Sequence, residues 1–98
     1  MNQHTCGATF DYVLSLNGVE PTEFVNWTTE CQMRDFSGKL LAIVESQWIN
    51  PAAPVALALF EIDTSKWRPG VALMDVRFIG PDGYIRTLQE PIQWELTR

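Results

Sequence analysis

The residues best suited to chemistry are few and lie mostly near the start of the chain. His4 is the only histidine, and the only cysteines are Cys6 and Cys31. A nucleophilic Ser or Cys needs a histidine base beside it, and a structural zinc site needs about four His or Cys ligands. These three side chains are too few for such a zinc site, and His4 stands in a segment, 1–8, that we expect to be frayed. We therefore predict no metal site and no catalytic set here.

Acidic side chains could supply another kind of chemistry, because two carboxylates at a suitable distance can hydrolyse a glycosidic bond. The chain has 12 Asp and Glu residues, but its glutamates fall at strand ends or on polar strand faces, where they keep the surface hydrated. The glycines are isolated turn residues and form no phosphate-binding loop. The sequence predicts neither an enzyme nor a bound cofactor.

The overall charge narrows the possible partners and the compartment. A net charge of -5 argues against nucleic acid and anionic membranes as partners, because both attract clustered Lys and Arg. No basic segment precedes an apolar stretch at the N-terminus, and no stretch approaches the length of a membrane span. We expect a protein made in the cytoplasm with two free thiols, and a Cys6–Cys31 bridge is the less favoured alternative.

The elements that would have to position any site look like β-strands. A chain of 98 residues has the size of one domain, 1–98. Apolar residues alternate with a period of two, or form short runs rich in β-formers, in seven segments. These are 10–16, 24–34, 40–46, 55–63, 71–79, 84–89 and 92–98. Both faces of the segment 55–63 are apolar, so its pattern also allows a helix, but its short length and the flanking Pro54 favour a strand.

Turn residues separate these segments. Two prolines predict a loop over 47–54, and Asp63 can accept backbone N–H bonds in a short capped turn. Gly, Pro, Asp and Asn predict tight turns at Asn17-Gly18, 35–39 and 80–83. About seven short strands without a convincing helix predict an all-β fold, an antiparallel immunoglobulin-like β-sandwich, with a compact barrel as the alternative.

A few polar and aromatic residues stand out within this pattern. Asp75 interrupts an apolar run, so it is either a buried carboxylate paired with Arg34 or Arg77 or an exposed residue on a wet strand face. Trp27 and Trp94 fit strand alternation and are expected in the core. Two further tryptophans stand in predicted loops, where they either cap the sandwich ends or form an exposed interaction surface. The candidate interaction residues are Trp48, Trp67 and Arg68.

An ordered set of short motifs resembles a known group of proteins. The matching pieces are Trp27 followed by Gln32-Met33-Arg34, then Pro69-Gly70, Asp75-Val76, Asp82-Gly83, Thr87-Leu88 and Thr97-Arg98. In this order they resemble immunoglobulin-like tail or baseplate domains of phages and prophages, of the kind found at the N-terminus of baseplate upper proteins. Ala72 departs from the pattern, which often has an aromatic residue there, and so does the segment 89–91.

The resemblance implies a virion structural protein, tail- or baseplate-associated and made in the bacterial host cytoplasm. Its partners would be other virion proteins or copies of itself, and it would work by docking and self-assembly. The resemblance also implies that Arg34 and Asp75 form a buried polar pair. The alternative is a carbohydrate-binding module in which Trp48 and Trp67 stack on a glycan.

Overall fold

The structure, a computed structural model, describes residues 2–16, 24–52 and 55–98, and these residues form eight β-strands. The strands are β1 (Asn2–Thr5), β2 (Phe10–Leu16), β3 (Thr28–Asp35), β4 (Leu40–Asn50), β5 (Val55–Glu61), β6 (Gly70–Ile79), β7 (Ile85–Thr87) and β8 (Ile92–Thr97). None of the described residues forms a helix that is long and apolar enough to cross a membrane.

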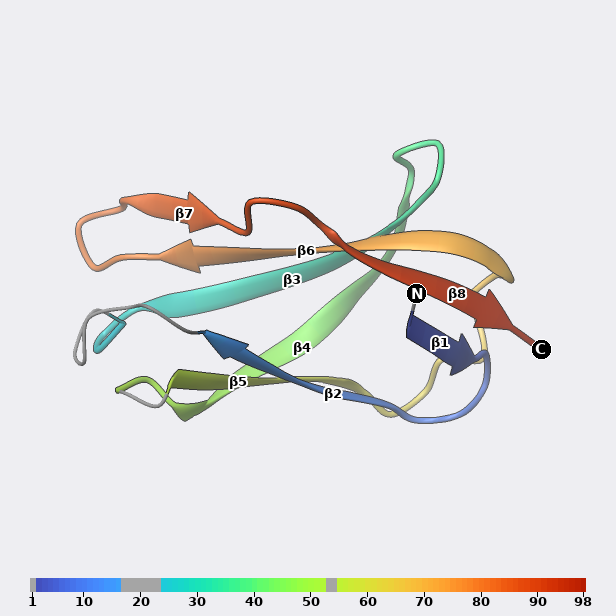
Figure 1. Ribbon diagram of the computed structural model, residues 1–98, viewed down its shortest axis with the longest axis horizontal. Helices are drawn as coiled ribbons and strands as arrows, with labels where there is room; N and C mark the ends of the chain where they lie inside the picture. Colours follow the sequence, from blue (N-terminus) through green and yellow to red (C-terminus); the bar gives the residue numbers. More distant parts are fainter. Residues whose placement is uncertain (1, 17–23, 53–54) are drawn as a thin grey trace.

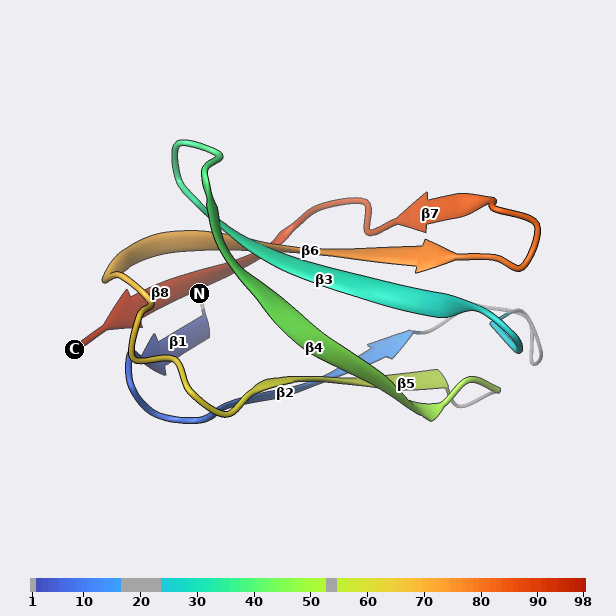
Figure 2. The same cartoon turned by 180° about the vertical axis from the view of Figure 1, so that it is seen from behind.

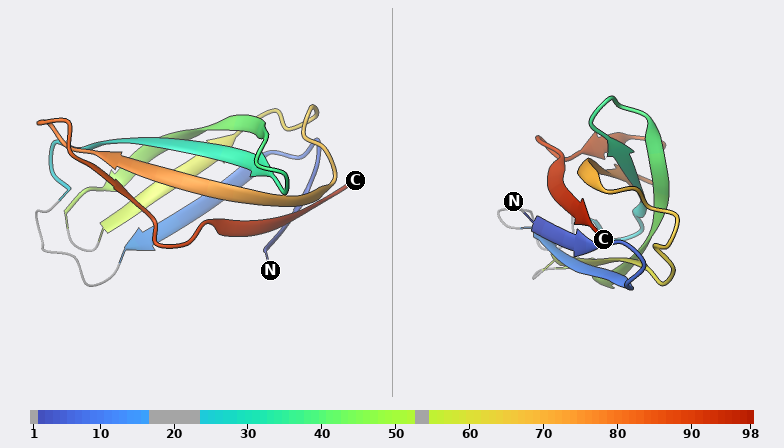
Figure 3. Two further views of the ribbon diagram at one scale, coloured as in Figure 1. Left: turned by 90° about the horizontal axis from the view of Figure 1, so that it is seen from above. Right: turned by 90° about the vertical axis from the view of Figure 1, so that its right-hand side faces the viewer.

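The strands are hydrogen-bonded in the order β1-β8-β6-β3-β4-β5-β2, and β7 pairs with β6 beside β8. All neighbours are antiparallel except β1 and β8, which are parallel. β3, β6, β7 and β8 form one layer, β2 and β5 lie in the other, and the long strand β4 crosses between them (Figures 1 and 2). The view along the long axis shows the layers wrapped around a common interior (Figure 3). The predicted all-β sandwich is confirmed.

The interior is filled by alternate residues of the paired strands. Met33 and Met74 face each other across β3 and β6, and both are fully buried. Leu57 and Leu59 project from β5 into the same core and are also fully buried. Because side chains alternate across a strand, the residues between these positions face outward and form the two outer faces of the sandwich.

Two of the predicted turns are confirmed, and local hydrogen bonds explain both. In the turn at 35–39 the N–H of Gly38 donates to the carbonyl of Asp35 at 3.0 Å, and Gly38 has a φ of 89°. In the turn at 80–83 the N–H of Gly83 donates to Gly80 at 3.0 Å, with a φ of 85° at Gly83. Glycine adopts such angles without steric cost. The predicted turn at Asn17-Gly18 lies outside the described residues.

The sequence-based prediction for the N-terminus was wrong. Residues 1–8 were expected to be frayed, but Asn2–Thr5 form β1 beside β8 and the N–H of Cys6 donates to the carbonyl of Thr97 at 2.6 Å. The hydroxyl of Thr64, which is fully buried, donates to the carbonyl of Ala8 at 2.5 Å and accepts from the N–H of Gly7 at 2.9 Å. These bonds tie the segment to the sandwich.

The loop predicted over 47–54 begins later than expected, after Asn50. β4 continues through Gln47 to Asn50, with a β-bulge between Trp48 and Asn50. The strand ends where Pro51 removes a backbone donor. The bulge inserts one extra residue, Ile49, and so adjusts the register at the end of the strand.

Candidate functional site

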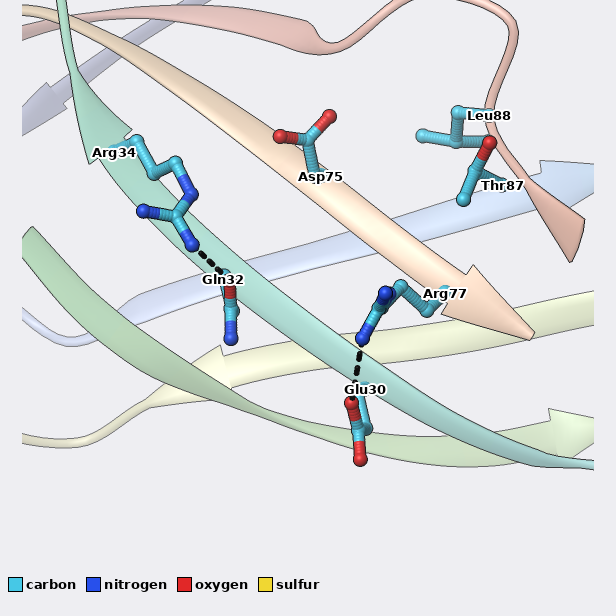
Figure 4. A pocket seen from close by; sticks show the side chains of 7 residues that line it. All are labelled: Glu30, Gln32, Arg34, Asp75, Arg77, Thr87 and Leu88. Carbon is cyan, nitrogen blue, oxygen red and sulfur yellow. Dashed lines mark hydrogen bonds and ion pairs between the residues drawn. The ribbon is translucent and has the colours of Figure 1, made fainter. Parts of the chain in front are cut away.

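A hollow on the outer face of β3 and β6 gathers most of the charged side chains that project from those strands. Outward positions alternate along each strand, and the register sets Glu30 opposite Arg77 and Gln32 opposite Asp75. Together with two residues from β7 and the chain after it, they surround a space of about 370 Å³ (Figure 4). The lining residues of this β3–β6 groove are Glu30, Gln32, Arg34, Asp75, Arg77, Thr87 and Leu88.

The groove exists because β6 changes partner along one edge. It pairs with β8 from Gly70 to Met74 and with β7 from Arg77 to Ile79, so Asp75 and Val76 lie between the two ladders. The chain between β7 and β8 leaves the sheet here and returns at Pro91, whose missing N–H suits a position outside the ladder. Leu88 therefore lines the hollow next to Asp75 and Val76, the β6 residues that pair with neither β7 nor β8.

The two guanidinium groups of the groove already have partners. Arg34 donates through Nη2 to Oε1 of Gln32 at 2.8 Å and through Nη1 to the carbonyl of Gly38 at 3.1 Å. Nη1 of Arg77 lies 3.9 Å from Oε2 of Glu30, and both of these side chains are about half exposed. Figure 4 shows the two contacts as dashed lines on the same side of β6. Both guanidinium groups therefore have partners within the described chain.

The exposed position of Asp75 contradicts the prediction that it forms a buried pair with Arg34. Its side chain is exposed, and within residues 2–16, 24–52 and 55–98 it makes no hydrogen bond or ion pair. In Figure 4 its carboxylate points away from the guanidinium of Arg34. The predicted buried pair of Arg34 and Asp75 is therefore wrong, because β6 alternation places Asp75 on the wet face.

On the core side of β3, beneath the groove, lies the thiol of Cys31, whose pKa is affected by the carboxylate of Asp75. Cys31 is buried and free, as expected. Burial raises the pKa of its thiol to about 12, and the nearby carboxylate of Asp75 adds to the rise. Cys31 is consequently an inert core residue at neutral pH.

The other predicted interaction residues do not form a joint exposed surface, because the two indoles are packed into the fold and only Arg68 is exposed. Trp67 is only 4% exposed, and Trp48 is half-buried with its indole Nε1 donating to the carbonyl of Trp27 at 2.9 Å. Nη2 of Arg68 lies 3.5 Å from the carboxylate of Asp35. Both indoles close the ends of the sandwich, which was the other interpretation considered for them.

His4 also belongs to a packed end of the fold. Its Nε2 lies 3.2 Å from the hydroxyl of Thr64, and its ring packs edge-on against Phe10 with the ring centres 5.2 Å apart. Burial lowers the pKa of His4 from its usual value, and a hydrogen bond to the backbone of Ala8 opposes part of that effect. No group of three or more His, Cys, Asp or Glu suited to a metal ion occurs in the described parts of the chain.

Sequence reasoning found Asp75 and Arg34 but missed the groove as a unit. Glu30, Gln32 and Arg34 alternate as polar residues, and this signal marks a wet strand face. Their meeting with Thr87 and Leu88 depends on the register of β6 against three strands. A single sequence does not specify that register.

Comparison with known proteins gives a fold neighbour. No protein-family model matches this chain, and no curated protein matches it. The fold is similar to that of CopC. The crystal structure of CopC from Methylosinus trichosporium OB3b superposes with a TM-score of 0.54 over 98% of this chain and 82% of that one. The two sequences are 19% identical, so the match shows a shared fold.

This neighbour overturns the function predicted from the sequence. The structure that superposes is that of CopC and not that of a phage structural protein. The prediction of a phage or prophage virion structural protein in a tail or baseplate is therefore wrong. The carbohydrate-binding alternative also fails, because the indoles of Trp48 and Trp67 are packed into the ends of the sandwich.

Proposed function

We propose that this protein is a non-catalytic binding domain whose β3–β6 groove holds the cationic end of an alkylammonium ligand. The observation that carries the proposal is the carboxylate of Asp75, exposed in the groove and without a partner in the described chain. An ammonium group offers three donors to such a carboxylate. Binding, and no turnover, is the proposed activity.

The net charge of the chain favours a cation over an anion, while acids and arginines balance within the groove. Arg77 has an acidic partner in Glu30, which offsets its charge, whereas Arg34 donates to the neutral oxygens of Gln32 and Gly38 and keeps its charge. The whole chain carries a formal charge of -5. Its long-range field therefore attracts small cations to the surface.

The remaining wall of the groove fits a short alkyl stem. Leu88 is half-buried, packs against the core and still lines the groove. Methylene groups lie favourably along such apolar surface while the charged end stays at a polar group, as in a lysine side chain. Thr87 lines the same side of the groove and offers a hydroxyl oxygen as an acceptor for a second ammonium proton.

No ligand is carried over from CopC to this chain, because a match at 19% identity shows a shared fold only. The single histidine of this chain faces Thr64, Phe10 and Trp67 within a packed end of the sandwich. The proposal therefore rests on the groove.

The test is a titration of the ¹⁵N-labelled protein with n-butylammonium, followed by amide chemical shifts. The amides of Asp75, Thr87 and Leu88 should shift, whereas 1-butanol, which has the same stem without the charge, should leave them unmoved. Asp75→Asn should weaken binding about fivefold, since a partly exposed ion pair contributes up to about 1 kcal/mol. Equal shifts with 1-butanol would contradict the proposal.

Glu95→Gln is the matched control for this substitution. Glu95 is an exposed strand glutamate on β8 outside the groove, so the change removes the same charge elsewhere. It should leave the n-butylammonium affinity unchanged. A loss equal to that of Asp75→Asn would show that net charge alone attracts the ligand, and the groove would then have no specific role.

A further inference from the structure

The outer face of β5 is apolar although nothing in the described chain covers it. Its inward residues Val55, Leu57 and Leu59 are 2%, 0% and 0% exposed. Its outward residues Ala56, Ala58 and Phe60 are apolar too and only half-buried. Strands with one wet face normally alternate apolar with polar residues, and β5 does not. This pattern is typical of a strand with a covering on both sides.

Neighbouring strands add exposed apolar side chains around this face, and the polar Ser15 and Gln47 lie opposite Ala56 and Ala58. Val13 of β2 lies opposite Ala58 and is 51% exposed. On β4, Ile43 and Ile49 are 67% and 59% exposed. We call this surface the β5 face, defined by Val13, Ile43, Ile49, Ala56, Ala58 and Phe60. Exposed apolar area of this kind marks interaction sites in soluble proteins.

The charges on these strands all have one sign. In register, Phe60 lies between Asp11 of β2 and Glu45 of β4. The three strands β2, β4 and β5 contain Asp11, Glu45 and Glu61 and neither Lys nor Arg. An aromatic ring between two carboxylates offers an apolar contact and two acceptors to a long cationic side chain.

We propose that the β5 face docks a basic amphipathic helix of a partner protein. Ala56 and Ala58 form a row of small residues along the central strand, so a helix can approach the sheet closely there. Apolar residues of the helix at i, i+3, i+4 and i+7 would contact Val13 and Phe60. Its Lys and Arg residues would reach Asp11 and Glu45, and this charge complementarity identifies the partner's chemistry.

Charge disfavours a second copy of this chain as the occupant. A two-fold dimer formed through this face would bring identical acidic surfaces together. Asp11 and Glu45 of one copy would face the same residues of the other without a cation between them. Like charges placed opposite each other are destabilising. A basic partner removes this repulsion.

The test uses a synthetic 18-residue helix of leucine and lysine, labelled with fluorescein, and measures its binding by anisotropy. A peptide of the same length with glutamate in place of lysine provides the opposite charge. The leucine–lysine peptide should bind at least tenfold more tightly than the leucine–glutamate peptide. Amide shifts should map its binding to Val13, Ala58 and Phe60. Equal affinities, or shifts confined to other residues, would overturn the proposal.

Two variants test the face directly. Ala58→Arg places a bulky cation at its centre, and Val13→Lys changes an exposed residue of an edge strand, so at least one folded variant is expected. Each should weaken binding of the leucine–lysine peptide at least tenfold. Gln93→Arg, an exposed position on β8, is the matched control and should leave the affinity unchanged. An equal loss in the control would contradict the proposal.

The solution mass decides between the two occupants. Light scattering after size exclusion should give a monomer for both the wild-type protein and Ala58→Arg. A wild-type dimer that Ala58→Arg dissociates would show that a second copy covers the β5 face, and the proposal of a basic partner would fall.

Discussion

The two outer faces of the sandwich use opposite chemistry on the same scaffold. The β3–β6 groove carries two arginines and two acids over a wet surface, whereas the β5 face is apolar with carboxylates only beside it. Inward residues are apolar on both sides, so the core does not explain the difference. The outward positions lie outside the core, so their composition can differ between the two faces of one scaffold.

The largest difference in the free energy of unfolding should appear between substitutions on the two sides of β5. Leu57→Ala removes a fully buried side chain and should lower the free energy of unfolding by about 2–5 kcal/mol. Ala58→Arg, one residue later and outward, should change it by about 0.5 kcal/mol or less. Urea denaturation of both variants measures this. A comparable loss in Ala58→Arg would mean that the outer face is structural.

The thiol below the groove should be almost inert. With a pKa of about 12, Cys31 is largely protonated at pH 8, and it is 1% exposed. A thiol-reactive disulfide should therefore modify Cys6, which is half-buried, and leave Cys31 intact until the protein is denatured. Mass spectrometry of peptides checks the sites. Modification of Cys31 in the native protein would show that the strands under the groove open readily.

Asp75 should matter for binding and little for folding. Because it is exposed and makes no ion pair in the described chain, Asp75→Asn should shift the free energy of unfolding by about 0.5 kcal/mol or less. A buried ion pair would cost several kcal/mol when broken. A large loss of stability in urea denaturation would restore the buried-pair interpretation and remove Asp75 from the ligand site.

The smallest effect should come from substituting His4, which lies on neither outer face, and it concerns the pH dependence of stability. Its folded pKa is lowered by burial, so the unfolded chain binds more protons as the pH falls below about 6.5. The stabilising contribution is complete above that pH and is lost as the pH falls through the lowered pKa. His4→Phe should flatten the dependence of Tm on pH between 7 and 5. An unchanged slope would show that other groups cause it.

Part of this fold could be predicted from sequence because the relevant interactions are local. Asp35 accepts hydrogen bonds from Ser37 and Lys39 within its own turn, so the turn at 35–39 needs no distant partner. β1 was missed because its stability comes from β8, at the other end of the chain. The alternation of residues along the strand allowed Asp75 to be either exposed or buried. The pairing register of β6 with β3 was needed to decide between these two positions.

The β5 face was visible in the sequence as a strand with two apolar sides, yet its exposure was not. Alternation of Val55, Leu57 and Leu59 with Ala56, Ala58 and Phe60 fits a strand in the middle of a fold as well as one in an outer layer. The structure puts β5 between β2 and β4 with one side outward. Layer order is a tertiary property, and local patterns do not encode it.

The central claim is that the two faces bind different ligands independently, and one ¹⁵N-labelled sample tests it. Amide shifts should be recorded first with n-butylammonium and then with the leucine–lysine peptide added. The account predicts two separate sets of shifted residues, one around Asp75 and Leu88 and the other around Val13 and Ala58. A single shared set of shifted residues would contradict it.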